Sequence, residues 1–172
     1  MPARVELERL YEDHAQALFS FLANLTRNEA DTRDLLQALF VKLAQRPGLF
    51  EGAREERALL LRLARNLAID LFRRRGAARR HSDALARQVQ AAPLFAPASE
   101  PDEQAFRKAL EAALDELPTE QREVVHLKLW EGLTFEQIAG LVDIPPNTAA
   151  SRYRYGLDKL RRRLRPLYDE IR

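Results

Sequence analysis

The fold is decided by residues 134–164, TFEQIAGLVDIPPNTAASRYRYGLDKLRRRL. Thr134 precedes a short apolar segment and Gln137 stands three residues later, which is the spacing of a capping box at a helix start. Asp143 follows at a position suited to a tight turn, because Asp tolerates left-handed backbone better than most residues. A longer helix is predicted to begin near Asn147. A short helix, a tight turn and a longer helix indicate a helix-turn-helix.

The longer helix is predicted to carry polar and basic side chains opposite an apolar stripe. Spacings of three or four residues place them on one face. They are Thr148, Ser151, Arg152 and Tyr155. The major groove of DNA, about 12 Å wide, admits one helix that presents such side chains. Arg161, farther along the helix, suits contact with phosphates. Plain bundle packing with a solvated arginine face remains the competing interpretation, and we favour DNA binding.

The rest of the 172-residue chain divides into two helical blocks. In the first block, apolar residues recur at helical spacing over three segments. Asn28 is predicted to cap the second helix and Pro47–Gly48 to end it. Residues 81–98 contain six Ala and two Pro, which favours a linker. We therefore expect an all-α protein with two small helical domains, 1–80 and 99–172, joined by a flexible linker, the second domain containing the helix-turn-helix.

Several local features of these blocks are also predicted. In the second block, Ser99 is expected to cap the first helix and Thr119 the next, after Pro118 breaks the pattern. Gly132 is expected to end that helix. The third helix of the first block is predicted to bury a leucine stripe. Its members are Leu59, Leu60, Leu63, Leu67 and Leu71.

Composition excludes several classes of chemistry. The chain has no Cys, so disulfides, Cys-ligated zinc, iron–sulfur clusters and thiol catalysis are ruled out. His14, His81 and His126 lack the spacing of metal ligands and are predicted to be surface or packing residues. No nucleophile–base pair or Gly-rich phosphate loop appears, so we expect neither an enzyme nor a cofactor. No apolar run approaches the roughly 20 residues that span a bilayer, so no membrane insertion is expected.

Four stretches together resemble one family. They are LYEDHAQALFSFLANL, EADTRDLLQALFVKLAQRPGLF, RLARNLAIDLFRRR and LDELPTEQREVVHLKLWEGLTFEQIAGLVDIPPNTAASRYRYGLDKLRRRL. In this order they resemble the first helix, the core-binding helix, the promoter-melting helix and the C-terminal domain of extracytoplasmic-function (ECF) sigma factors. They cover nearly all of the chain except the linker. The resemblance implies a transcription initiation factor that binds bacterial RNA polymerase core in the cytoplasm, directs it to promoters and helps to open the DNA.

The resemblance implies that the second predicted helix docks on the largest polymerase subunit. The residues that match are Asp34, Leu35, Leu36 and Gln37. Asp34 and Gln37 lie three residues apart on one helix face, beside apolar side chains, which suits a partner helix that carries Arg. Leu35 and Leu36 are equally compatible with a place in the core.

The same resemblance implies two promoter contacts. The minus-ten element would meet Arg62, Arg65, Asn66, Asp70, Arg73 and Arg74. Arg suits phosphates and Asn can recognise a base edge in an opened strand. The minus-thirty-five element would meet Thr148, Ser151, Arg152, Tyr155 and Arg161. An anti-sigma protein, which often holds the family inactive, is a further candidate partner.

The chain departs from the family pattern at several positions. Ala38 stands where an acid is usual, and Ala149–Ala150 replaces a usual Val–Lys pair. Glu56 and Leu59 stand where Phe and Trp are usual before the melting helix, which removes aromatic stacking platforms there.

Two other functions stay open at the level of sequence. The second block alone would serve a free-standing helix-turn-helix DNA-binding regulator, and loss of the DNA contacts would leave a protein-interaction module.

Overall fold

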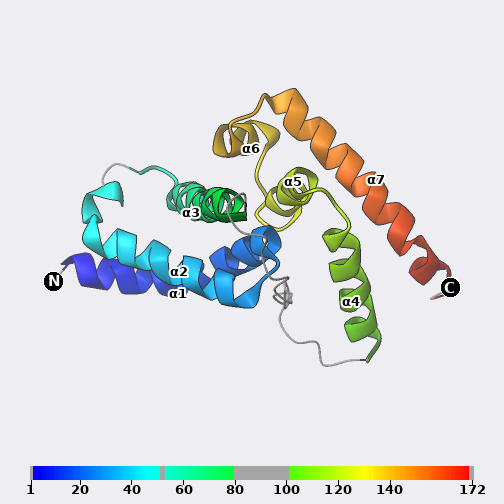
Figure 1. The fold of residues 1–172 in the computed structure, drawn as a ribbon, viewed down its shortest axis with the longest axis horizontal. Helices are drawn as coiled ribbons and strands as arrows, with labels where there is room; N and C mark the ends of the chain where they lie inside the picture. Colours follow the sequence, from blue (N-terminus) through cyan, green and yellow to red (C-terminus); the bar gives the residue numbers. More distant parts are fainter. Residues whose placement is uncertain (1, 51–52, 80–100, 171–172) are drawn as a thin grey trace. The chain divides into compact units, whose positions relative to one another are not determined.

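The computed structural model describes residues 2–50, 53–79 and 101–170 (Figure 1). In these ranges the chain forms seven α-helices and one short 3₁₀ helix, and no strand. The expected all-α class is therefore confirmed. The chain divides into two compact units, which we call unit 1 (Met1–Ala92) and unit 2 (Pro93–Arg172). The expected linker, 81–98, and the expected cap at Ser99 lie outside the described residues.

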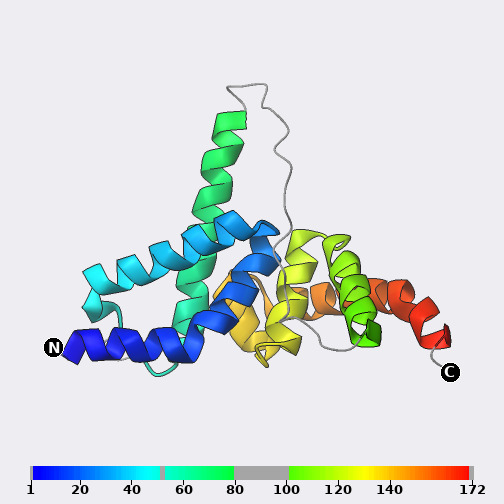
Figure 2. The ribbon, with the colours of Figure 1, turned by 90° about the horizontal axis from the view of Figure 1, so that it is seen from below.

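Unit 1 is a three-helix bundle. Its helices are α1 (Pro2–Thr26), α2 (Glu29–Gln45) and α3 (Glu56–Arg79), with the 3₁₀ helix η1 (Pro47–Phe50) after α2. The Asn28 side chain accepts a hydrogen bond from the Asp31 N–H at 2.9 Å, so the predicted cap of α2 is confirmed. The predicted end of α2 before Pro47 is also confirmed. Helix α3 crosses both other helices, and its last turns extend past them (Figure 2).

The buried stripe of α3 differs from the predicted one. Leu60, Leu61, Ala64 and Ala68 are at most 1% exposed, whereas the other four predicted leucines are only half-buried. The prediction gave leucines precedence over alanines as core residues. The core of unit 1 instead buries two alanines, whose small side chains leave room for the large residues of α1, such as Phe21.

Unit 2 contains four helices, of which the last two form the helix-turn-helix. They are α4 (Pro101–Asp115), α5 (Thr119–Leu129), α6 (Phe135–Val142) and α7 (Pro146–Glu170). The capping box of Thr134 and Gln137 is present in both directions. Asp143 adopts a left-handed backbone (φ 59°, ψ 54°) between α6 and α7, which is the conformation expected of this turn. The helix-turn-helix prediction is therefore confirmed.

The start and end of α5 correct two local predictions. Thr119 does not cap this helix, because the N-cap position is Pro118 and no side-chain cap bond forms there. The Pro118 carbonyl instead accepts the N–H groups of Gln121 and Arg122, each at 3.0 Å. Helix α5 ends at Leu129, and Gly132 supplies a left-handed residue (φ 66°) three positions later.

Helices α5 and α7 approach each other closely at Gly156. A Cβ atom at this position would lie 2.8 Å from Cγ2 of Val125. Carbon atoms in ordinary contact are about 3.5–4.0 Å apart, so only glycine fits here without movement. This close approach lies where α7 packs on α5. None of the described helices is both long enough and apolar enough to cross a membrane.

Candidate nucleic-acid interface

Helix α2 presents a polar edge with one half-buried leucine. Asp34 and Gln37 are exposed on α2, and Leu36 between them is half-buried. Leu35 is only 5% exposed and belongs to the core of unit 1. The structure therefore favours the core interpretation for Leu35. The accessible edge consists of Asp34, Leu36 and Gln37.

Helix α3 presents the second group of expected residues. Five of them are exposed, and Arg65 is half-buried. The exposed ones are Arg62, Asn66, Asp70, Arg73 and Arg74. Arg62 and Arg73 are eleven residues apart, or about three turns of an α-helix, so they point in nearly the same direction. The Nε–H group of Arg74 donates to the carbonyl of Asp70 at 3.4 Å, which holds that side chain along the helix.

The arginine run at the end of α3 is divided between two directions. Arg75 donates two hydrogen bonds to the Asp31 carboxylate of α2, at 2.5 and 2.6 Å. The Asp31 side chain is only 13% exposed, so this pair lies against the bundle. The carboxylate raises the pKa of Arg75 above its usual value. Arg75 is thus occupied in packing α3 on α2, while Arg73 and Arg74 remain on the outer surface.

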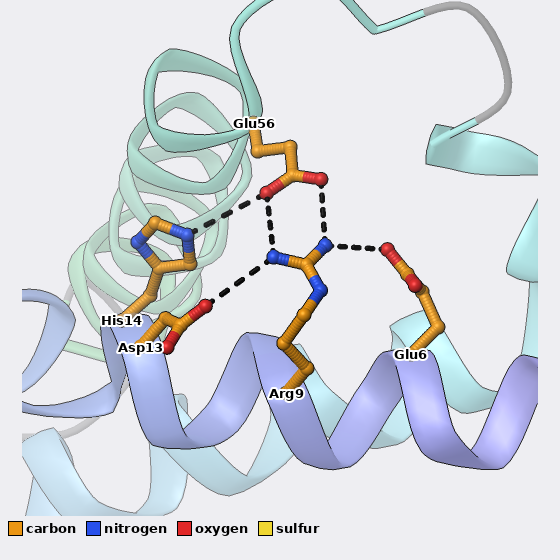
Figure 3. Close-up of polar contacts among 5 residues, drawn as sticks. All are labelled: Glu6, Arg9, Asp13, His14 and Glu56. Atoms are coloured by element: carbon orange, nitrogen blue, oxygen red, sulfur yellow. Dashed lines mark hydrogen bonds and ion pairs between the residues drawn. The ribbon is translucent and has the colours of Figure 1, made fainter.

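A cluster that sequence reasoning missed joins α1 to the start of α3 (Figure 3). Arg9 of α1 donates to both carboxylate oxygens of Glu56, at 2.7 and 3.2 Å. Glu6 and Asp13, one turn to either side on α1, also accept from Arg9 at 2.5 and 3.3 Å. His14 Nε2 lies 3.8 Å from Glu56. The hydrogen bonds from Arg9 hold the pKa of Glu56 below its usual value.

Of the Arg9–Glu56 contact, only the glutamate has a local sequence signal. Glu56 is the first residue of α3, where a carboxylate is favoured by the helix dipole. Its partner lies 47 residues earlier in the chain, and no local pattern connects the two.

The outer face of α7 contains the third group of expected residues. Thr148, Ser151 and Arg152 are half-buried near the start of α7. Tyr155 is 54% exposed, and Arg154 lies over its ring with a guanidinium-to-centroid distance of 5.2 Å. Arg161 is exposed two turns farther along. The structure thus places all five residues on one helix, with the first four grouped in its first three turns.

The neighbouring residues of α7 have packing roles. Ala149 is fully buried, and Leu160 and Leu164 are at most 8% exposed. Tyr153 packs edge-on against Phe135 of α6, with 5.6 Å between ring centroids. This contact ties α7 to α6, so Tyr155 is the exposed aromatic residue of the pair at 153 and 155.

The arginine run in the second half of α7 also contains one residue that pairs with an acid. Arg163 donates through Nε to Glu116 at 2.9 Å, which joins α7 to the region that follows α4. Arg161 and Arg162 are exposed beside it. Within the described ranges, no group of three or more His, Asp or Glu side chains could hold a metal ion.

The chain matches proteins of one family along nearly its whole length. Residues 10–78 match the model of sigma-70 region 2, and residues 107–160 match that of sigma-70 region 4. The chain is 34% identical over 169 residues to the RNA polymerase sigma factor CarQ of Myxococcus xanthus, covering 98% of this chain and 95% of that protein. It is 28% identical over 170 residues to the ECF RNA polymerase sigma factor SigX of Bacillus subtilis, covering 94% and 85%.

A solved structure has the same fold. It is the sigma factor RpoE in complex with the anti-sigma factor NepR from Bartonella quintana. The TM-score is 0.75 at 25% sequence identity, over 93% of this chain and 97% of that one. Together with the sequence matches, this establishes that the chain belongs to the sigma-70 family of RNA polymerase sigma factors and to its extracytoplasmic-function type.

Proposed function

We propose that this ECF sigma factor uses three surfaces, one to bind core polymerase and two to bind promoter DNA. The edge of α2 formed by Asp34, Leu36 and Gln37 docks on core polymerase. The outer face of α3 binds the melted minus-ten strand. The first turns of α7 enter the major groove at the minus-thirty-five element. As a member of its family, the chain is a transcription initiation factor that binds core polymerase and directs it to promoters.

One observation carries the assignment of the DNA contacts. Each unit exposes basic residues on one helix while a neighbouring arginine in the same run is paired to an acid. In unit 1, Arg73 and Arg74 are exposed beside the paired Arg75. In unit 2, Arg161, Arg162 and Arg163 are all exposed, and Arg163 also donates to Glu116. Exposed arginines on two separate units suit two separate contacts with a polyanion.

The mechanism needs binding energy and no chemical step. Opening DNA loses stacking of about 1.4 kcal/mol per base step, which contacts to the single strand must offset. The Arg residues of α3 suit its phosphates, and Asn66 suits a base edge. Because RNA polymerase core is the partner, we place this activity in the cytoplasm.

We also propose that an anti-sigma protein binds this chain. The support is the structural neighbour RpoE, which was solved with the anti-sigma factor NepR.

The test is transcription with purified core polymerase from promoter templates, including the region upstream of the chain's own gene. Asp34→Arg should abolish core binding, and Arg152→Glu should abolish promoter selection while core binding persists. Matched controls are Glu12→Arg on α1 and Lys108→Glu on α4, since both residues are exposed and lie outside the three surfaces. Specific binding of duplex DNA without any binding of core would refute the proposal and leave a free-standing regulator.

A further inference from the structure

Helix α3 is attached to the rest of unit 1 by an ion pair near each end. At its first residue, Glu56 receives two hydrogen bonds from Arg9 of α1. Nineteen residues later, Arg75 donates two hydrogen bonds to Asp31 of α2. The two arginine–carboxylate contacts thus tie α3 to a different helix at each end. The exposed residues assigned to the minus-ten strand lie between or beside these two attachments.

The attachment at the start of α3 has a defined geometry. Two parallel hydrogen bonds between a planar guanidinium and a carboxylate fix orientation as well as distance. Glu6 and Asp13 also accept hydrogen bonds from Arg9, but these two contacts stay within α1, whereas the contact with Glu56 joins α1 to α3 (Figure 3). Arg9 therefore acts as a rigid link between the two helices.

The attachment near the end of α3 complements the first. Asp31 lies in the first turn of α2, where the Asn28 cap fixes its backbone N–H. Arg75 follows Arg73 and Arg74 directly in sequence, so its position determines the direction in which those two side chains leave the helix. A helix held at both ends has little freedom to rotate about its axis.

We propose that Arg9, Glu56, Asp31 and Arg75 are positioning residues that set the rotation of α3, and thereby the match between its outer face and the minus-ten strand. This inference rests on the proposed function of that face. The side chains of Arg9 and Glu56 are 41% and 36% exposed. Ion pairs this exposed contribute little to global stability. The removal of the Arg9–Glu56 pair should therefore change strand recognition more than it changes folding.

The experiment uses the full chain bound to core polymerase, and it measures the affinity for a labelled minus-ten single strand and for a scrambled strand. Glu56→Gln removes the charge and one acceptor with little change in shape. Glu6→Gln is the matched control, because it removes an acceptor from the same Arg9 side chain without breaking a link between helices. Arg75→Gln tests the other end of α3.

Glu56→Gln and Arg75→Gln should each lower the specific-to-scrambled affinity ratio by about tenfold, which corresponds to one well-placed base contact. Glu6→Gln should leave the ratio unchanged, and all three variants should bind core and minus-thirty-five duplex normally. Arg9→Lys, which keeps the charge but loses the two-pronged contact, should lower the ratio to an intermediate value.

Two results would overturn the inference in distinguishable ways. If wild-type holoenzyme itself shows no preference for the minus-ten strand, the proposed function of α3 fails. If the wild type shows the preference, but Glu56→Gln and Glu6→Gln leave the ratio equally intact, the positioning role alone fails. A lower melting temperature for Glu56→Gln with an unchanged ratio would likewise assign the pair to stability.

Discussion

Replacing Gly156 with alanine tests how tightly α7 is fixed on α5. The new Cβ would lie 2.8 Å from Cγ2 of Val125, roughly 0.7 Å or more inside ordinary contact. Overpacking of this kind costs about 1–3 kcal/mol. Alanine regains about 1 kcal/mol of helix propensity over glycine. We therefore expect Gly156→Ala to destabilise unit 2 by about 0–2 kcal/mol and to weaken minus-thirty-five binding, because α7 must shift to relieve the contact.

The assay is urea unfolding of the full chain, followed by the fluorescence of Trp130. This is the single tryptophan of the chain, and it lies in unit 2, stacked on His126 with 5.5 Å between ring centroids. Its signal therefore reports unit 2 even when unit 1 unfolds separately. Gly140→Ala is the matched control, because a Cβ at Gly140 meets nothing within 4 Å and should stabilise α6.

A double mutant tests the cause. Val125→Ala removes the clashing Cγ2 atom, so the cost of Gly156→Ala should shrink in its presence. The coupling free energy should be about 0.5–3 kcal/mol in favour of the double mutant, as for other residues in direct contact. If Gly156→Ala instead stabilises unit 2 as much as Gly140→Ala does, and shows no coupling to Val125→Ala, the close-contact argument is refuted.

Three further predictions concern charge and capping. Because Arg9 holds the folded-state pKa of Glu56 below its usual value, Glu56 stabilises unit 1 above the usual pKa and loses this effect as pH falls through the lowered one; hydrogen exchange of α1 and α3 should show a steeper acid loss in wild type than in Glu56→Gln. Thr134→Ala should cost about 1 kcal/mol in the Trp130 unfolding assay, since it removes half of the capping box; an unchanged midpoint would contradict this. Arg161→Ala should reduce the salt dependence of minus-thirty-five binding by about one unit of slope with sequence preference unchanged; a changed base preference would instead assign Arg161 to base recognition.

The features that sequence predicted well depend on residues close together in the chain. Asn28 caps α2 through a residue three positions away, and Thr134 and Gln137 cap each other at the same spacing. The left-handed turn at Asp143 depends on one residue. Each of these signals is complete within one helical turn, so it can be recognised without knowing the fold.

The features that sequence missed depend on which face of a helix meets its neighbours. Leu59 and Leu60 are equally apolar, yet only Leu60 is fully buried, because it lies on the face of α3 that packs on the other helices of unit 1. The same applies to the docking edge, where Leu35 is in the core and Leu36 is partly accessible. The ion pairs of α3 join residues 44 and 47 positions apart, and no periodic pattern can reveal them.

The two arginine runs show why a count of basic residues misjudges a nucleic-acid surface. Each run supplies one arginine to an acid on another part of its own unit, Arg75 to Asp31 and Arg163 to Glu116. The two pairs differ in exposure: Arg75 meets an aspartate that is 13% exposed, whereas Arg163 stays 63% exposed while it contacts Glu116. Arg75 is therefore held against unit 1 beside the exposed Arg73 and Arg74, whereas an ion pair as exposed as that of Arg163 contributes little to stability. Because the net charge is only +2, we expect the placement of the arginines, more than total charge, to decide how strongly the chain attracts a polyanion.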